Sequence, residues 1–128
     1  MHPNNVLWYF KESPYFESMS NNNILIQQLS YNEHLKHILF NKELFEARLR
    51  GMSGLEFIVG EQPADPSPAG TGVYVIRKQM RRKRQMEEDE VIVLSTYHVV
   101  GMNIYMASVV ADILGSRMVY LETLVLPY

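Results

Sequence analysis

The chain has 128 residues, a length typical of one domain with its own core. Apolar residues make up 47% and charged residues 20%, which excludes a disordered or fibrous protein. The absence of cysteine excludes disulfides and thiolate zinc sites, and it fits a reducing compartment. No apolar run is long enough to cross a bilayer, and the N-terminus lacks the pattern of a secretory signal. We therefore expect one domain over residues 1–128 and no membrane association.

The first 54 residues predict a helical and aromatic part. In NNVLWYFKESPYF (4–16), Asn4 or Asn5 can cap a short helix. That helix should end before Ser13-Pro14, because a residue before proline avoids the helical region. The asparagine run 21–23 predicts a turn and a cap before a second helix.

Residues 24–50 also predict helix, as one bent helix or as two or three short ones. Ser30 and Glu33 have the spacing of a capping box. Asn41-Lys42 is a plausible break, and Gly51 and Gly54 should stop the helix. Apolar residues recur afterwards at mostly three- and four-residue steps, at Leu35, Ile38, Leu39, Phe45, Leu49 and Met52.

Four strand-like blocks follow, at 55–59, 73–79, 91–94 and 97–107. They are separated by a proline- and glycine-rich loop (60–72) and a charged loop (80–90). The second and third blocks are apolar on both faces, which predicts central strands. In the last block, Gly101 suggests a bulge or a close backbone approach. Alternation predicts that the core face carries His98, Val100, Met102, Ile104 and Met106.

Residues 108–126 predict a C-terminal helix, capped by Ser108. Its broad apolar face would carry Val110, Ile113, Leu114, Met118, Leu121, Leu124 and Val125. The predicted fold class is α+β, with a small antiparallel sheet of about four strands over 55–107. N-terminal helices and the C-terminal helix would pack against this sheet.

The sequence predicts no catalytic, metal or cofactor site. It lacks the phosphate loop, the dinucleotide-binding glycine pattern and the nucleophile elbow. His34 and His37 have a helical i, i+3 spacing, but no supporting ligand is suggested. An enzyme centred on His98 is a weak alternative, and His98→Ala is expected to change stability alone.

The charge block at 77–90 allows three interpretations. It holds six cations and four acids, a net charge of +2, so the rest of the chain carries −4. The interpretations are a solvated hairpin, a docking patch for an acidic partner, and a nucleic-acid-binding module using the basic hairpin 77–84. The acids can fold back and neutralise the cations, and no aromatic residue is interleaved for base stacking. Direct nucleic-acid binding is therefore the least favoured reading. The candidate residues for contact with a charged partner are Arg81, Arg82, Lys83 and Arg84.

Two segments offer more apolar surface than a small core needs. They either pack on the sheet or meet a partner protein, since large exposed apolar patches usually mark interfaces. The partner-binding candidates are Trp8, Tyr9, Phe10, Tyr15 and Phe16 in the N-terminal stretch, and Arg117, Met118, Leu121 and Leu124 near the C-terminus.

Five blocks in order resemble the sixth subunit of the Mediator complex. They are NNVLWYFKESPYFE with NNN (4–17 and 21–23), GLEFIV (54–59), VYVIRKQ (73–79), TYHVVGMNIYMA (96–107) and ILGSRM (113–118). The family pattern usually extends beyond both ends of these 128 residues, and the charged loop here is longer than in that pattern.

The resemblance implies a non-enzymatic structural and docking subunit of the Mediator head module, a nuclear coactivator of RNA polymerase II transcription. It implies protein partners among the helical-bundle subunits of the head, and beyond them the middle module and the polymerase. It implies no cofactor.

Overall fold

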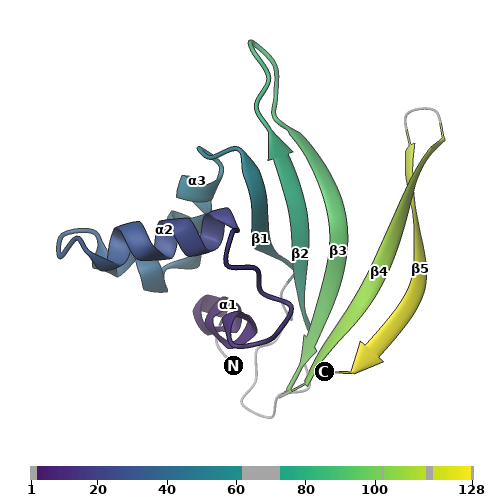
Figure 1. Cartoon of the computed structure of the whole chain (residues 1–128), viewed down its shortest axis with the longest axis horizontal. Coiled ribbons are helices and arrows are strands. Elements are labelled where there is room, and N and C mark those ends of the chain that lie inside the picture. The colour runs from purple at the N-terminus through teal and green to yellow at the C-terminus, as the bar shows by residue number, and fades with distance from the viewer. Residues whose placement is uncertain (1–2, 62–72, 102, 115–116, 128) are drawn as a thin grey trace.

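The computed structural model describes residues 3–61, 73–101, 103–114 and 117–127, with side chains described over residues 4–60, 73–101 and 103–106. The chain begins with helices and continues with strands (Figure 1). The helices are α1 (Pro3–Lys11), α2 (Asn21–Ser30), the 3-10 helix η1 (Lys36–Phe40) and α3 (Lys42–Leu49). The strands are β1 (Gly54–Glu61), β2 (Val73–Arg82), β3 (Glu90–Val100), β4 (Asn103–Leu114) and β5 (Arg117–Pro127). The α+β class predicted from the sequence is confirmed.

Among these residues the strands form one antiparallel sheet of five, in the order β1-β2-β3-β4-β5. The blocks at 73–79 and 91–94 fall in β2 and β3, which are interior strands, as their two-sided apolar character predicts. Of the predicted 60–72 loop, Gly60 and Glu61 belong to β1. Residues 62–72 lie outside the described residues.

The block at 97–107 is two strands, and the prediction of one strand was wrong. Val100 pairs with Asn103, so the chain reverses at Gly101, whose φ of 59° suits a glycine in a tight turn. The reversal changes the phase of the alternation. Tyr97, Val99 and Ile104 are therefore the core residues, at 3%, 1% and 1% exposure. His98 lies half-buried on the opposite face, and Met102 lies outside the described residues.

The predicted helix at 108–126 was also wrong, because this segment forms the end of β4 and the whole of β5 (Figure 1). Val110 pairs with Leu121, and Ile113 pairs with Met118. The segment is rich in β-branched residues, which favour strands, and its Gly115-Ser116 dipeptide is typical of two-residue hairpin loops. Its apolar residues also fit a helical spacing, and antiparallel strand pairing decided between the two periods.

The starts of α1 and α2 differ from the predicted ones. Helix α1 starts at Pro3, so Asn4 and Asn5 lie inside it, and it ends before Ser13-Pro14 as expected. The N-cap of α2 is Ser20, whose hydroxyl accepts a hydrogen bond from the Asn23 amide at 3.3 Å. The asparagine run is therefore the first turn of α2 and does not precede it.

The region 24–50 forms three short helices. Ser30 is the last residue of α2 and donates to the Ile26 carbonyl at 2.6 Å, so it makes no capping box with Glu33. The break predicted at Asn41-Lys42 is confirmed. The Asn41 side chain caps α3 by accepting from the Leu44 amide at 3.0 Å.

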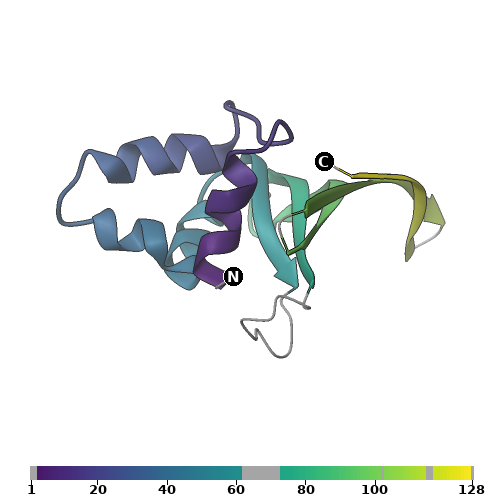
Figure 2. The same cartoon turned by 90° about the horizontal axis from the view of Figure 1, so that it is seen from below.

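The helices pack on one side of the molecule, while the β4–β5 hairpin extends away on the other (Figure 2). One core cluster lies between α1 and the sheet, where Phe10 and Phe57 are fully buried with 5.3 Å between their ring centroids. A second cluster joins α2, η1 and α3 around Leu29 and Leu49. Leu7 packs against both clusters, so α1 connects the two parts of the core.

The outer edge of β1 is closed by side chains from the helices. Asn22 donates to the Phe57 carbonyl and accepts from the Phe57 amide, both at 2.7 Å. Two residues further along, the Val59 amide donates to Glu46 of α3 at 2.9 Å. Backbone groups that would otherwise be unpaired at a sheet edge are thus satisfied, which prevents another strand from pairing there.

Candidate docking site

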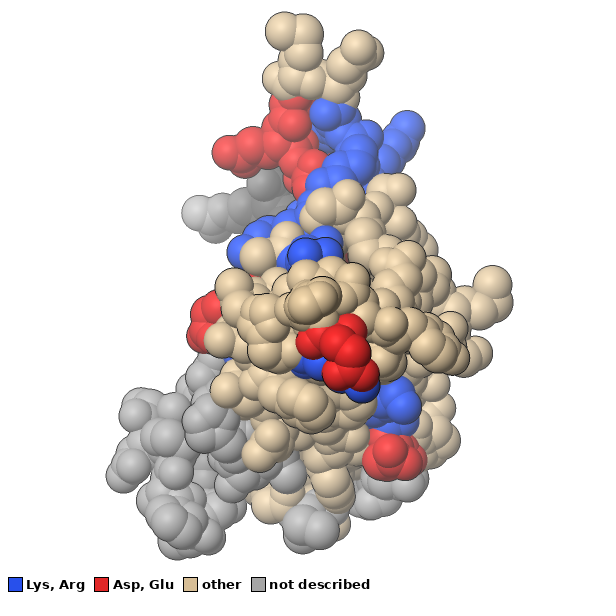
Figure 3. Space-filling model, turned by 90° about the vertical axis from the view of Figure 1, so that its left-hand side faces the viewer, with Lys and Arg blue, Asp and Glu red and all other residues tan. Residues whose placement is uncertain are grey.

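The charged hairpin between β2 and β3 neutralises itself. Arg81 and Lys83 both pair with Asp89, at 3.0 and 2.8 Å. Arg84 pairs with Glu87 at 2.9 Å and lies 3.7 Å from Glu90. Figure 3 shows cationic and acidic side chains side by side at this end of the molecule, over a largely uncharged helical face. The prediction that the acids fold back onto the cations is confirmed.

Arg81 is structural. Its guanidinium donates to the fully buried Glu56 at 2.9 and 3.1 Å, and Gln79 donates to the same carboxylate at 2.7 Å. The hydrogen bond that Arg81 donates to Glu56 is the largest factor that raises the pKa of Arg81. Because a buried carboxylate needs such partners, this cation serves the sheet and is not available to a charged ligand. Arg82, by contrast, is exposed.

The N-terminal aromatic residues pack against the chain's own sheet. Phe10 is 0% exposed, and its ring centroid lies 4.9 Å from that of Tyr97. Phe16 stacks on Phe57 with 5.3 Å between ring centroids. The ring centroids of Tyr15 and Tyr97 are 5.1 Å apart. Tyr9 is half-buried against the same cluster. These four aromatic residues therefore form part of the core between α1 and the sheet.

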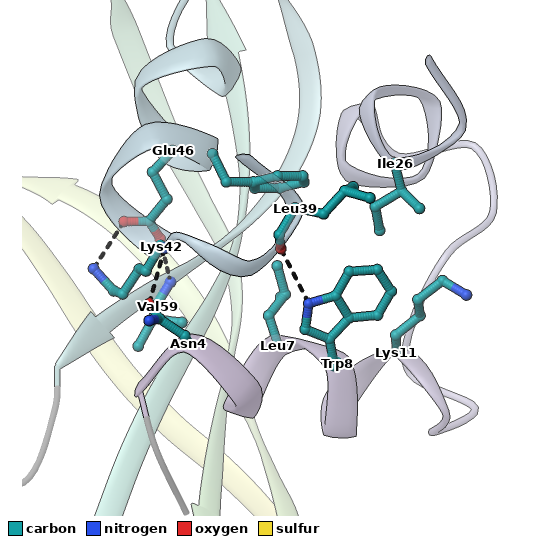
Figure 4. Close-up of a pocket in the computed structure, with 10 residues that line it drawn as sticks. Asn4, Leu7, Trp8, Lys11, Ile26, Leu39, Lys42, Glu46 and Val59 are labelled. Carbon is teal, nitrogen blue, oxygen red and sulfur yellow. Dashed lines mark hydrogen bonds and ion pairs between the residues drawn. The ribbon is translucent and has the colours of Figure 1, made fainter. Parts of the chain in front are cut away.

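Trp8 points away from that cluster and lines a pocket between α1, α2, η1, α3 and β1 (Figure 4). The pocket is small, because its volume of about 20 Å³ holds roughly one water molecule. The Trp8 indole donates to the Leu39 carbonyl at 3.2 Å, which fixes the ring in place. The apolar lining is Leu7, Trp8, Ile26, Leu39, Phe45 and Val59.

Polar groups lie at the two ends of the pocket (Figure 4). At one end, Lys42 and Glu46 form a largely buried ion pair at 2.9 Å. The Asn4 side chain accepts from the Lys42 amide there at 2.9 Å. At the other end Lys11 extends beyond Trp8, and it has no carboxylate partner in the part of the chain that the structure describes. The lining thus carries two cations and one anion.

Of the predicted site residues whose side chains the structure describes, Trp8 alone lines this pocket. Arg117, Met118, Leu121 and Leu124 lie along β5, far from it in the sheet order. The sequence interpretation missed Lys11, Leu39 and Phe45 as lining residues. A spacing of four between Lys42 and Glu46 was the one available signal, because it predicts an ion pair on a helix.

The predicted histidine pair does not share a helix face in the structure. His34 lies in the turn between α2 and η1, and His37 lies in η1, so the two do not share a regular helix. Over the described residues, no group of three or more His, Asp or Glu side chains could hold a metal ion. None of the helices described is both long and apolar enough to span a membrane.

Comparison with known proteins decides the family. Residues 1–125 match the family described as MED6 mediator sub complex component. The chain belongs to the Mediator subunit 6 family. The resemblance seen in the five sequence blocks is thereby confirmed.

Relatives named Mediator of RNA polymerase II transcription subunit 6 include those of Neurospora crassa and Aspergillus fumigatus, each 49% identical over 91% of this chain. The chain spans about a third of these Mediator subunit 6 proteins, 35% and 39% of their lengths. Among solved structures, the Mediator subunit Med6 of Schizosaccharomyces pombe is 30% identical, with a TM-score of 0.58. That match covers 84% of this chain and 64% of the other.

Proposed function

We propose that this chain is a non-enzymatic structural and docking part of the Mediator complex, acting in RNA polymerase II transcription in the nucleus. The observation that carries the proposal is the family match over residues 1–125, together with relatives at 49% identity that are named as this Mediator subunit. The described residues offer packed aromatic rings and neutralised charges, which suit a structural part of an assembly.

The partners we propose are other subunits of the head module, with the middle module and the polymerase beyond them. Two surfaces are candidates for these contacts. One is the helical side that carries Trp8. The other is the projecting β4–β5 hairpin with Arg117, Met118, Leu121 and Leu124, which stay predictions from the sequence.

Co-expression of the chain with the other head-module subunits, followed by size-exclusion chromatography, tests the proposal. We expect the chain to elute with the assembly. Elution of the chain alone, while the remaining subunits assemble, would show that the proposal is wrong.

The double variant Leu121→Asp/Leu124→Asp tests the second surface. We expect the variant to lose co-elution while its thermal unfolding in isolation stays close to that of the parent chain. If unfolding shifts instead and co-elution of the folded variant persists, these leucines serve the fold of this chain and not a partner.

A further inference from the structure

The sheet is split between β3 and β4. Pairing between these two strands stops at Ser95 and Ser108, and Figure 1 shows the strands diverging beyond this pair. Among the described residues, the 90–94 end of β3 therefore pairs with β2 alone, and the 109–114 end of β4 pairs with β5 alone. Each end thus leaves one backbone edge without a neighbouring strand in the part of the chain that the structure describes.

Burial along β3 follows this difference in pairing. In the half that pairs on both sides, Tyr97 and Val99 are 3% and 1% exposed. In the half that pairs on one side, Ile92 and Leu94 are 40% and 39% exposed. The stretch VIVL (91–94) is nevertheless apolar at every position, a composition typical of strands inside a covered sheet. This end of β3 therefore carries apolar residues that the described residues cover only in part.

Among the described residues, no side chain closes the open edge of β3. At the opposite edge of the sheet, Asn22 and Glu46 bond to backbone groups of β1 and so prevent further pairing. The stretch 91–94 also lacks lysine and proline, the residues that commonly protect a sheet edge. The edge of β3 at the split is therefore open to a further strand.

The open edge identifies the occupant as an extended segment of polypeptide. Unpaired N–H and C=O groups along a strand are satisfied together by another strand, in β-augmentation. The charged residues of the two diverging ends are Glu90 and Asp112, which are both acidic. They would repel a phosphate backbone or an acidic segment and attract a basic residue. A second copy of either end would bring the same acids, which disfavours self-association.

We propose that an extended segment of another Mediator subunit adds as a strand to the open edge of β3 at residues 90–94, within the split between β3 and β4. The segment carries apolar residues, which cover Ile92 and Leu94, and a basic residue, which lies near Glu90. Burial of this apolar area favours the addition. The inference deepens the proposed function and rests on it for the identity of the partner.

Hydrogen–deuterium exchange followed by mass spectrometry tests the strand addition. It compares the free chain with the chain assembled with the other head-module subunits. Amides of residues 90–94 should exchange about tenfold more slowly, or slower still, in the assembly, because a strand that pairs there protects them. Amides of residues 97–100, which pair on both sides, should be protected in the free chain already.

The double variant Ile92→Lys/Leu94→Lys places lysine at the open edge, as natural sheets do to prevent pairing. Its apparent affinity for the other head-module subunits should fall by about tenfold or more, because an ammonium group would be buried against an apolar strand. Val73→Lys is the matched control, since Val73 is also 40% exposed but lies at the other end of β2. This control should leave the affinity unchanged. Circular dichroism melts establish that both variants are folded.

Two outcomes would overturn the inference. One is exchange over residues 90–94 that does not slow in the assembly, and the other is an affinity that the folded double variant retains. Either of them, obtained while the parent chain still elutes with the head-module subunits, removes the strand addition and leaves the proposed function standing. Loss of co-elution with the parent chain removes the proposed function itself.

Discussion

At the scale of single residues, the main result is that the charged side chains most conspicuous in the sequence are engaged within the chain. Arg81 holds the buried Glu56, and Lys83 donates both to Asp89 and to the Arg50 carbonyl at the end of α3. Because Arg81 and Lys83 have these internal partners, the hairpin is joined to β1 and to the helices. Its charge thus supports the fold more than it attracts a ligand.

Asp89 should make stability depend on pH. Hydrogen bonds from Lys83 first and Arg81 second hold the pKa of Asp89 below its ordinary value. A lowered folded-state pKa means that the ion pairs stabilise the protein above the unfolded-state pKa of about 4 and are lost as the pH falls below it. Asp89→Asn should therefore lower the melting temperature at pH 7, and the difference from the parent chain should shrink as the pH falls below about 4.

The control for this series is Glu88→Gln, an exposed neighbour in the same turn. Its melting temperature relative to the parent chain should be nearly independent of pH. A difference between Asp89→Asn and the parent chain that stays constant from pH 7 to pH 3 would contradict the role given to the Asp89 ion pairs.

At the scale of elements, helices α2 and α3 protect the edge of the sheet. Asn22 and Glu46 bond to Phe57 and Val59 of β1, two residues apart on the same outer edge. Side chains of these two helices therefore bond to the backbone groups with which a further strand would otherwise pair. Asn22 therefore closes the edge of the sheet and also forms part of the first turn of α2.

Asn22→Ala tests this element-scale contact. The substitution leaves two buried backbone groups of Phe57 without partners, so we expect it to destabilise the protein by about 2–4 kcal/mol. Urea denaturation followed by circular dichroism measures the change. Asn23→Ala is the matched control, because its exposed hydrogen bond to the Ser18 carbonyl should contribute less than about 1 kcal/mol. Equal effects of the two substitutions would contradict the role of Asn22 in closing the edge.

The elements also show where sequence reasoning succeeded and where it failed. Strands β2 and β3 were predictable because their residues are apolar on both faces and have one plausible period. The segment 108–126 fits the helical and the strand periods, so local pattern could not decide between them. The turn at Gly101 was missed because a two-residue reversal leaves the apolar composition unbroken on either side.

At the scale of the whole molecule, the chain has a largely uncharged helical side and a sheet that projects beyond it (Figures 2 and 3). The pocket site could not be predicted from sequence because its lining comes from five separate elements.

Most cations of the charged hairpin pair with acids of the same chain. We therefore expect the whole molecule to bind nucleic acid weakly. In a salt titration with duplex DNA, the slope of log K against log salt should be smaller in magnitude than about 2, because few cations are free to displace counterions. The double variant Arg82→Glu/Arg84→Glu should give nearly the same slope. A slope of several units that this variant abolishes would instead favour the nucleic-acid-binding alternative.

The sequence by itself determined the fold class, the helical N-terminal part, the interior strands and the family, because these depend on local periodicity and on ordered blocks of residues. Only the tertiary structure decided that 108–126 pairs as strands, that Tyr97 and Val99 face the core, and that Asp89 pairs with Arg81 and Lys83. The physical reason is the same in each case. Strand pairing, face selection and charge pairing depend on residues distant in the chain, and the positions of those residues follow from packing rather than from local pattern.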